Sequence, residues 1–129
     1  MDCLFCKIIK GDIPSKTVYE DDLVKVFLDI NPSTNGDMLV VPKKHFENIY
    51  DIDDNLLLHI HKVIKELYDL LKEKLSCDGL TIVQNNGHGQ EIKHYHVHVT
   101  PRYSNDKITT NKNTDILVSI DDVFEQIKN

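Results

Sequence analysis

The run His94-Tyr95-His96-Val97-His98-Val99 constrains the fold of this chain more than any other segment, because three histidines alternate with apolar residues. Successive side chains of a β-strand point to opposite faces, so the histidines would share one face and the apolar residues the other. We therefore expect a sheet that packs on one face at this strand and presents imidazoles on the other.

Hydrophobic patterns predict the other helices and strands. A short helix over residues 4–9 ends at Gly11 to Pro14, and from Asp53 onward apolar residues recur every three or four positions, which is typical of a long amphipathic helix ending near residues 76–79. Ser119–Ile127 is expected to form a capped terminal helix. The predicted strands are Thr17–Glu20, Leu23–Leu28, Met38–Val41, Leu80–Gln84 and Lys93–Pro101, the first three as an antiparallel meander.

Length and charge narrow the class of protein. With 129 residues, of which 40% are hydrophobic, the chain is expected to form one domain over residues 1–129. A net charge of -6 argues against a nucleic-acid partner, whose backbone is bound through many Lys and Arg contacts. Apolar stretches of a few residues, and an N-terminus without the pattern of a signal peptide, predict no membrane association and a cytoplasmic location.

A row of imidazoles suits phosphate chemistry. A neutral imidazole is a nucleophile, and a protonated neighbour donates to developing charge on phosphate oxygens. The preceding loop, Gly87-His88-Gly89-Gln90, offers backbone N–H groups to an anion. A polar outer strand face is the alternative. A metal site made by all three histidines is disfavoured, because the Cα atoms of His94 and His98 would lie about 13 Å apart on a strand.

Cys3 and Cys6 are separated by two residues, a spacing that is typical of half of a tetrahedral zinc site or of a redox pair. The chain has three cysteines, and Cys77 lies alone near the end of the long helix. In a reducing compartment a metal is favoured over a disulfide, but two more ligands are needed.

The segment His94–Thr100 resembles the signature of the histidine triad (HIT) family, in which three histidines alternate with apolar residues. Further segments resemble the Hint-like branch of that family, so that the resemblance covers residues 2–103 and leaves 104–129 as a variable tail. The segments that carry this resemblance are Cys3–Ile9, Ile13–Pro14, Val18–Asp22, Phe27–Ile30, Leu39–His45, Asn85–Gly87 and Gly89–Gln90. The resemblance implies a HIT-like α+β fold: a five-stranded antiparallel sheet with one long helix and one or two short ones, in a homodimer with a joined ten-stranded sheet.

The same resemblance implies residue roles toward a purine nucleoside monophosphate, AMP or GMP, or its conjugate. His96 resembles the nucleophile, His98 the residue that hydrogen-bonds the phosphate, and His94 the first histidine of this catalytic row. Asp29 corresponds to the carboxylate that accepts the ribose hydroxyls. The phosphate and ribose contacts are completed by Asn85, Gly89 and Gln90. Glu91, also assigned to the nucleotide site, stands where Hint proteins often have a serine that assists the leaving group. The base slot corresponds to Leu4, Phe5, Ile8, Ile13, Phe27, Leu28 and Ile30, any of which is equally an ordinary core residue.

For the metal, the resemblance completes the pair Cys3 and Cys6 with His45 and His94. This set would hold a structural zinc ion, and no catalytic metal is expected; unoccupied thiols are the alternative. Asp29 could instead be a turn former, and His59, His61 and His88 are expected in solvent.

The resemblance implies a hydrolase or phosphoramidase that cleaves the α-phosphate linkage of a nucleotide conjugate through a nucleotidyl-histidine intermediate. Two alternatives stay open. Lys93 before the triad and Pro101-Arg102 after it are also similar to the Fhit branch, which hydrolyses dinucleoside polyphosphates. A non-catalytic nucleotide-binding partner module would keep the same slot without turnover.

Overall fold

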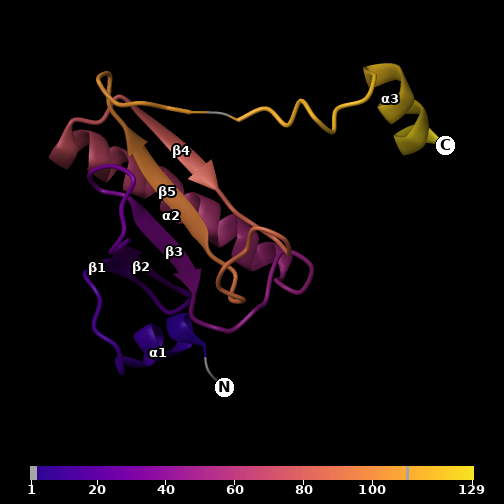
Figure 1. Ribbon diagram of the computed structural model, residues 1–129. Helices are drawn as coiled ribbons and strands as arrows, with labels where there is room; N and C mark the ends of the chain where they lie inside the picture. Colours follow the sequence, from indigo (N-terminus) through magenta and orange to yellow (C-terminus); the bar gives the residue numbers. More distant parts are fainter. Residues whose placement is uncertain (1–2, 110) are drawn as a thin grey trace.

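The computed structural model describes residues 3–109 and 111–129 and contains a five-stranded antiparallel sheet with a helix on each face (Figure 1). The strands lie in the order β1-β2-β3-β5-β4. Their bounds are β1 Thr17–Glu20, β2 Val24–Leu28, β3 Met38–Pro42, β4 Gly79–Val83 and β5 Val97–Arg102; the helices are α1 Leu4–Lys10, α2 Asp54–Leu75 and α3 Ile120–Lys128. The predicted α+β class and five-stranded sheet are confirmed.

Helix α2 begins where Asp53 accepts a hydrogen bond from the Leu56 N–H at 2.8 Å, and it ends at Ser76, whose φ of 54° leaves the helical region. Its apolar stripe packs on one face of the sheet. The buried residues of α2 are Leu56, Ile60, Val63, Ile64, Leu67 and Leu71, and they form one core with Tyr95, Val97 and Val99 and with residues of β2 and β3.

Helix α1 covers the other face. Cys3 caps it, because its Sγ accepts the Cys6 N–H at 3.3 Å, and Gly11 ends it with a φ of 90° that favours glycine. Phe5 and Ile8 pack in a second apolar cluster with residues of β2 and β3. The first turn of α1, which carries both cysteines, therefore lies against the sheet.

The prediction that β5 begins at Lys93 is wrong: the strand begins at Val97. Its last pair with β3 is Val40 with Val97, because Pro42 has no N–H and its carbonyl oxygen contacts the His94 ring instead. The alternation nevertheless continues before the strand. Tyr95 is buried in the α2 core, whereas the rings of His94 and His96 contact Phe5 of α1 on the opposite face.

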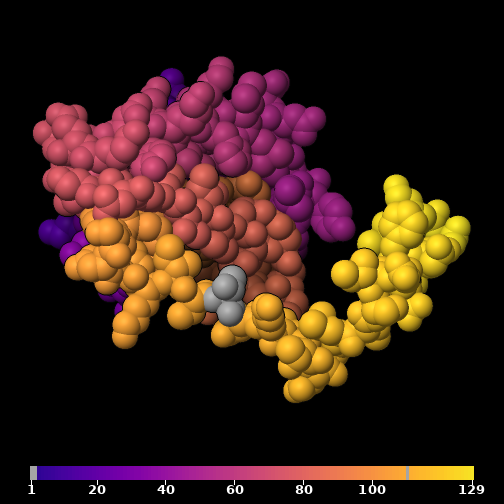
Figure 2. All heavy atoms as spheres, turned by 90° about the horizontal axis from the view of Figure 1, so that it is seen from above, coloured from indigo at the N-terminus to yellow at the C-terminus, as the bar shows by residue number. Residues whose placement is uncertain are grey.

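After β5 the chain leaves the sheet at Tyr103, whose hydroxyl donates to the Asn35 carbonyl oxygen at 2.7 Å. Helix α3 is capped by Ser119 as predicted, and none of its residues is buried. Figures 1 and 2 place it at the end of an extended segment, apart from the sheet. In the described part of the chain, no helix combines the length and apolar character needed to cross a membrane.

Candidate active site and metal centre

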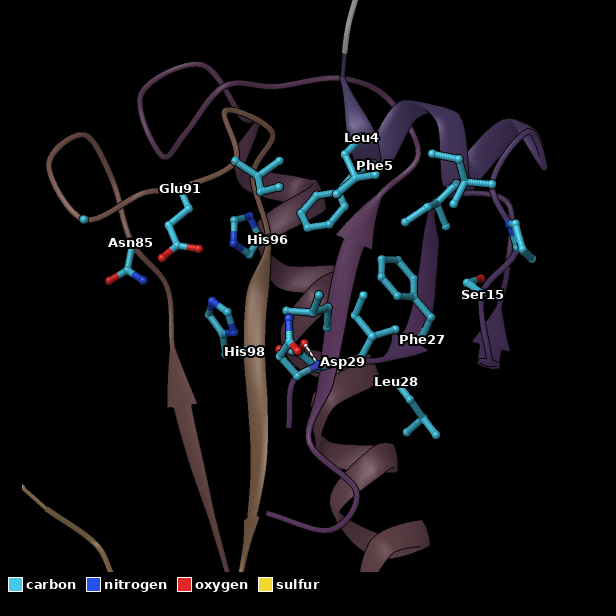
Figure 3. Close-up of a pocket in the computed structure, with 18 residues that line it drawn as sticks. Leu4, Phe5, Ser15, Phe27, Leu28, Asp29, Asn85, Glu91, His96 and His98 are labelled. Carbon is cyan, nitrogen blue, oxygen red and sulfur yellow. Dashed lines mark hydrogen bonds between the residues drawn. The ribbon is translucent and has the colours of Figure 1, made fainter. Parts of the chain in front are cut away.

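A pocket of about 390 Å³ lies on the α1 face of the sheet, a size that suits a small-molecule ligand (Figure 3). Its walls are formed by helix α1, the end of β2, the start of β3, the start of β5 and the loop before it. The apolar lining residues are Leu4, Phe5, Ile8, Ile13, Pro14, Phe27, Leu28, Ile30, Leu39 and Ile92. The polar ones are Ser15, Asp29, Asn31, Asn85, Gly89, Glu91, His96 and His98.

The protonation of the His96 ring follows from one hydrogen bond. Its Nδ1 lies 2.7 Å from the main-chain carbonyl oxygen of His94, and a carbonyl oxygen can only accept. Nδ1 therefore carries the hydrogen, and in the neutral ring Nε2 keeps its lone pair. The side chain is only 5% exposed, and the Phe5 ring meets it edge-on at 5.0 Å. His96 thus presents an oriented, unprotonated nitrogen at the pocket.

Burial also keeps this ring neutral. Desolvation lowers the pKa of His96 below its ordinary value of 6.5, and the neighbouring His98 lowers it further; the hydrogen bond to His94 and the charges of Asp29 and Glu91 act in the opposite direction. The ring of His98 lies 5.1 Å from that of His96. Two imidazole rings therefore stand side by side at the pocket, and that of His96 presents an unprotonated nitrogen.

Asp29 follows β2 and lines the pocket. Its Oδ1 accepts the Asn31 N–H at 2.9 Å, which is the local turn bond that the turn interpretation predicts. Among the described residues, its second carboxylate oxygen accepts no hydrogen bond. Asp29 therefore shapes the turn and still has an oxygen available for a ligand.

The loop over residues 84–92 divides its side chains between the pocket and the interior. Asn85, Gly89 and Glu91 line the pocket, and Gly89 has a φ of 94°, which an L side chain would strain. Gln90, by contrast, is 5% exposed and does not line the pocket. Its Nε2 donates to the carbonyl oxygens of Glu47 and Ile92 at 2.6 and 3.0 Å, so in this structure Gln90 braces the loop.

Sequence reasoning missed five lining residues, which are Pro14, Ser15, Asn31, Leu39 and Ile92. Leu39 could have been predicted, because it alternates with Val40 on a predicted strand and therefore points away from the α2 core. In the sheet it pairs with His98. The others lie in irregular segments, where spacing gives no direction. His94 does not line the pocket and belongs to a neighbouring cluster.

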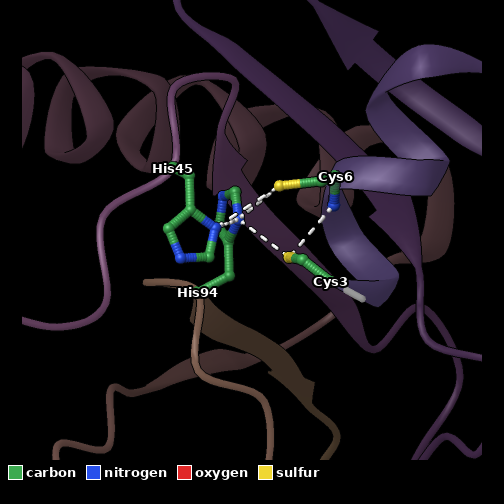
Figure 4. A group of neighbouring side chains, drawn as sticks. All are labelled: Cys3, Cys6, His45 and His94. Carbon is green, nitrogen blue, oxygen red and sulfur yellow. Dashed lines mark hydrogen bonds between the residues drawn. The ribbon is translucent and has the colours of Figure 1, made fainter. Parts of the chain in front are cut away.

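Cys3, Cys6, His45 and His94 form that cluster, with one ligand atom from each residue within 4.8 Å of the others (Figure 4). His94 Nδ1 lies 3.4 Å from the Sγ of Cys3 and 3.5 Å from the Sγ of Cys6. His45 Nδ1 lies 3.4 Å from the Cys6 Sγ and 3.0 Å from His94 Nδ1. Two segments distant in sequence thus supply the ligands that the cysteine pair lacked.

The donor set fits zinc. Bonds of about 2.0 to 2.3 Å in a tetrahedron place ligand atoms about 3.3 to 3.8 Å apart. The four distances given above, 3.0 to 3.5 Å, are close to these values, and all ligand atoms lie within 4.8 Å of one another. The Nε2 of His94 lies 2.8 Å from the Pro42 carbonyl oxygen, so this nitrogen carries the hydrogen and Nδ1 is left as the ligand. Burial, followed by the Cys3 hydrogen bond, raises the pKa of the Cys6 thiol to about 11, and a metal ion would have to displace that proton.

Residues 10–105 match the sequence model of the HIT domain family. The chain is 48% identical over 132 residues to an uncharacterized HIT-like protein of Methanocaldococcus jannaschii, with 98% of both chains covered. It is 38% identical to adenosine 5'-monophosphoramidase HNT1 of Saccharomyces cerevisiae, over 78% of this chain and 62% of that one. The crystal structure of a Zn-bound histidine triad family protein from Mycobacterium smegmatis superposes with a TM-score of 0.81 at 34% identity, covering 88% and 84% of the two chains.

Proposed function

The chain belongs to the HIT domain family, and from that premise we propose that it hydrolyses the α-phosphate linkage of a purine nucleotide conjugate through a covalent nucleotidyl-His96 intermediate. The proposed substrate is a nucleoside phosphoramidate. The observation that carries this proposal is the His96 ring, whose Nδ1–H is held by the His94 carbonyl oxygen at 2.7 Å while Nε2 stays unprotonated at a nucleotide-sized pocket.

The reaction proceeds in two displacements. The Nε2 lone pair of His96 attacks the α-phosphorus, the bond from phosphorus to the leaving nitrogen breaks, and that nitrogen keeps the electron pair, takes a proton and departs as an amine. Water then attacks the same phosphorus, and the bond to Nε2 breaks with its electron pair returning to the ring. The products are the nucleoside monophosphate and the neutral histidine, with one proton released.

The other pocket residues bind the nucleotide and stabilise the charge on its phosphate. His98 donates to phosphate oxygens beside His96, and the Gly89 amide adds a backbone donor; Gln90 acts through the loop that it braces. Phe5, Phe27 and the other apolar residues enclose the base, and Asp29 accepts hydrogen bonds from the ribose hydroxyls. A purine conjugate is supported by the similarity to the yeast relative, an adenosine 5'-monophosphoramidase.

Cys3, Cys6, His45 and His94 are proposed to hold a zinc ion with a structural role. These four protein ligands would fill a tetrahedral set and leave no position for water or substrate, as is typical of a structural zinc site. The ion would fasten α1 to the segment before β5 and fix the main chain of His94, to which His96 is hydrogen-bonded. No step of the reaction passes through the metal.

A homodimer joined through β4 is proposed as the working assembly. In the described residues β4 pairs only with β5, so its outer edge has free backbone groups, and Ile82 and Val83 are 45% and 41% exposed. The other edge, β1, is interrupted by an irregularity between Thr17 and Tyr19, a feature that discourages pairing. Two β4 edges would make one ten-stranded sheet.

Two further proposals concern the whole chain. We place it in the cytoplasm, since Cys3 and Cys6 are free thiols grouped with imidazoles, which is typical of a reducing compartment. Residues 1–129 are proposed to act as one HIT domain, with 104–129 as an appended tail.

The test is to trap the intermediate. The protein is mixed with adenosine 5'-phosphoramidate, quenched within one turnover in denaturant at alkaline pH, where a phosphorus–nitrogen bond to histidine is stable, and analysed by mass spectrometry. We expect the intact chain plus one adenylyl group, with peptide mapping that locates it on His96. Label on His94 or His98, or hydrolysis without any adenylated chain, would contradict the covalent route.

A further inference from the structure

The pocket is divided by its histidines into two regions of different chemistry (Figure 3). The apolar slot and Asp29 lie on one side of His96 and His98, and Asn85 and Glu91 lie on the other. Resting on the proposed function, we propose that Glu91, with Asn85, forms a leaving-group subsite that selects amines carrying a positive charge.

The placement of the nucleoside decides which part of a substrate meets Glu91. With the base in the apolar slot and the phosphate at His96, the space lined by α1, β2 and β3 is taken up by the base. The remaining substituent on phosphorus is therefore directed to the side that Asn85 and Glu91 line. Because the leaving group departs from this side, its charge interacts with these two residues.

Glu91 has no partner that would neutralise its charge. Within residues 3–109 and 111–129 it makes no hydrogen bond and no ion pair, and its side chain points into the pocket region (Figure 3). Lys93, two residues later, directs its Nζ to the Gly87 carbonyl oxygen at 3.3 Å. No Lys or Arg is found among the described residues that line the pocket. The leaving-group side thus carries an uncompensated negative charge.

This negative charge disfavours a polyphosphate leaving group and favours a positively charged amine. A polyphosphate leaving group brings several negative charges to a carboxylate with no lysine or arginine to offset them, which is unfavourable. An amine with an ammonium tail gains an ion pair with Glu91 and a hydrogen-bond acceptor in the Asn85 amide oxygen. When the phosphorus–nitrogen bond breaks, the electron pair stays on nitrogen, which takes a proton; the tail keeps its charge throughout.

The experiment compares three adenosine 5'-phosphoramidates that differ in the tail of the amine: 1,3-diaminopropane (cationic), butylamine (neutral) and 3-aminopropionate (anionic). For the unmodified protein, we expect kcat/KM to fall from the cationic to the neutral to the anionic compound, by about fivefold a step, as is typical of a partly exposed ion pair. Glu91→Gln should remove most of this preference, and Glu91→Lys should reverse it. Glu73→Gln, an exposed carboxylate on α2, is the matched control and should keep the wild-type order.

A binding measurement separates this inference from the proposed function. The dissociation constants of the same three compounds are measured on His96→Ala and on His96→Ala/Glu91→Gln, neither of which needs turnover. Preference for the cationic compound in the first protein and its loss in the second support the subsite, even if the unmodified protein hydrolyses none of the three. Equal affinities in His96→Ala, or an unchanged order of kcat/KM in Glu91→Gln, would overturn it.

Discussion

The Nδ1 atom of His96 lies 2.7 Å from the carbonyl oxygen of His94, while the ring of His94 itself points into the cysteine and histidine cluster. One residue therefore belongs to both sites: its main chain orients the proposed nucleophile, and its side chain completes the proposed zinc set. A change in the cluster that moves the main chain of His94 is therefore expected to disturb the orientation of the His96 ring and to slow the reaction.

Replacing the histidines of the pocket should separate their roles. His96→Ala removes the attacking nitrogen, so the adenylated intermediate should disappear and kcat should fall by several orders of magnitude, with nucleotide binding largely kept. His98→Ala keeps the nucleophile and loses a donor to the phosphate, which for one such contact costs about 10² to 10³ in rate. Single-turnover kinetics with an alkaline denaturing quench measures both, and undiminished turnover in His96→Ala would exclude the assignment.

Loss of a cysteine ligand should release the metal. The protein purified under reducing conditions without chelator is expected to carry about one zinc ion per chain, and Cys3→Ser should lose that ion together with thermal stability. Because the cluster fixes His94, kcat should also fall. Metal analysis and thermal unfolding are the measurements. Cys77→Ser, a buried cysteine outside the cluster, should keep the zinc; a metal-free unmodified protein would rule the site out.

Asp29 should determine ribose recognition. Its free carboxylate oxygen predicts that Asp29→Ala weakens AMP binding by about 1 to 3 kcal/mol, the usual cost of losing a charged hydrogen-bond partner. Since this variant also removes the turn bond with Asn31, a ligand change provides the control. The unmodified protein should bind 2',3'-dideoxy-AMP more weakly by a similar amount, and titration calorimetry compares the two. Equal affinity for both nucleotides would contradict the role.

Asp21 should make stability depend on pH in acid. Burial pushes its pKa upward, but hydrogen bonds from the Leu23 and Val24 N–H groups, His59 and Tyr19 outweigh this and lower the pKa to about 2. A carboxyl group with a lowered pKa stabilises the fold above its ordinary value of 3.8 and loses this contribution as pH falls toward 2.

Asp21→Asn should therefore reduce the free energy of unfolding by roughly 1 to 2 kcal/mol at pH 7, and the difference from the unmodified protein should shrink between pH 4 and pH 2. Chemical denaturation across this range measures it. Asp22→Asn, at the exposed neighbouring position, should change little at any pH. A difference that stays constant down to pH 2 would contradict the pKa of Asp21.

Much of the fold followed from the sequence, because strand alternation, helical periodicity and end signals act between residues close in the chain. The long helix begins after Asp53, where its periodicity was expected to start, Ser119 caps the terminal helix, and Thr17–Glu20 is a strand with the predicted bounds. The alternation of the histidine segment also placed His96 and Tyr95 on opposite faces of the sheet.

Tertiary structure decided what depends on partners distant in sequence. β5 begins only at Val97, because Pro42 ends the ladder on β3. Gln90 turns inward to the Glu47 carbonyl oxygen, and His59, expected in solvent, bonds Asp21 at 2.8 Å. Cys3 contacts His94, which lies 91 positions later in the chain. The family resemblance implied this contact, but the spacing of the two cysteines could not predict it. The physical reason is that a residue's own segment determines its backbone, whereas the direction and partner of its side chain depend on what packs against it.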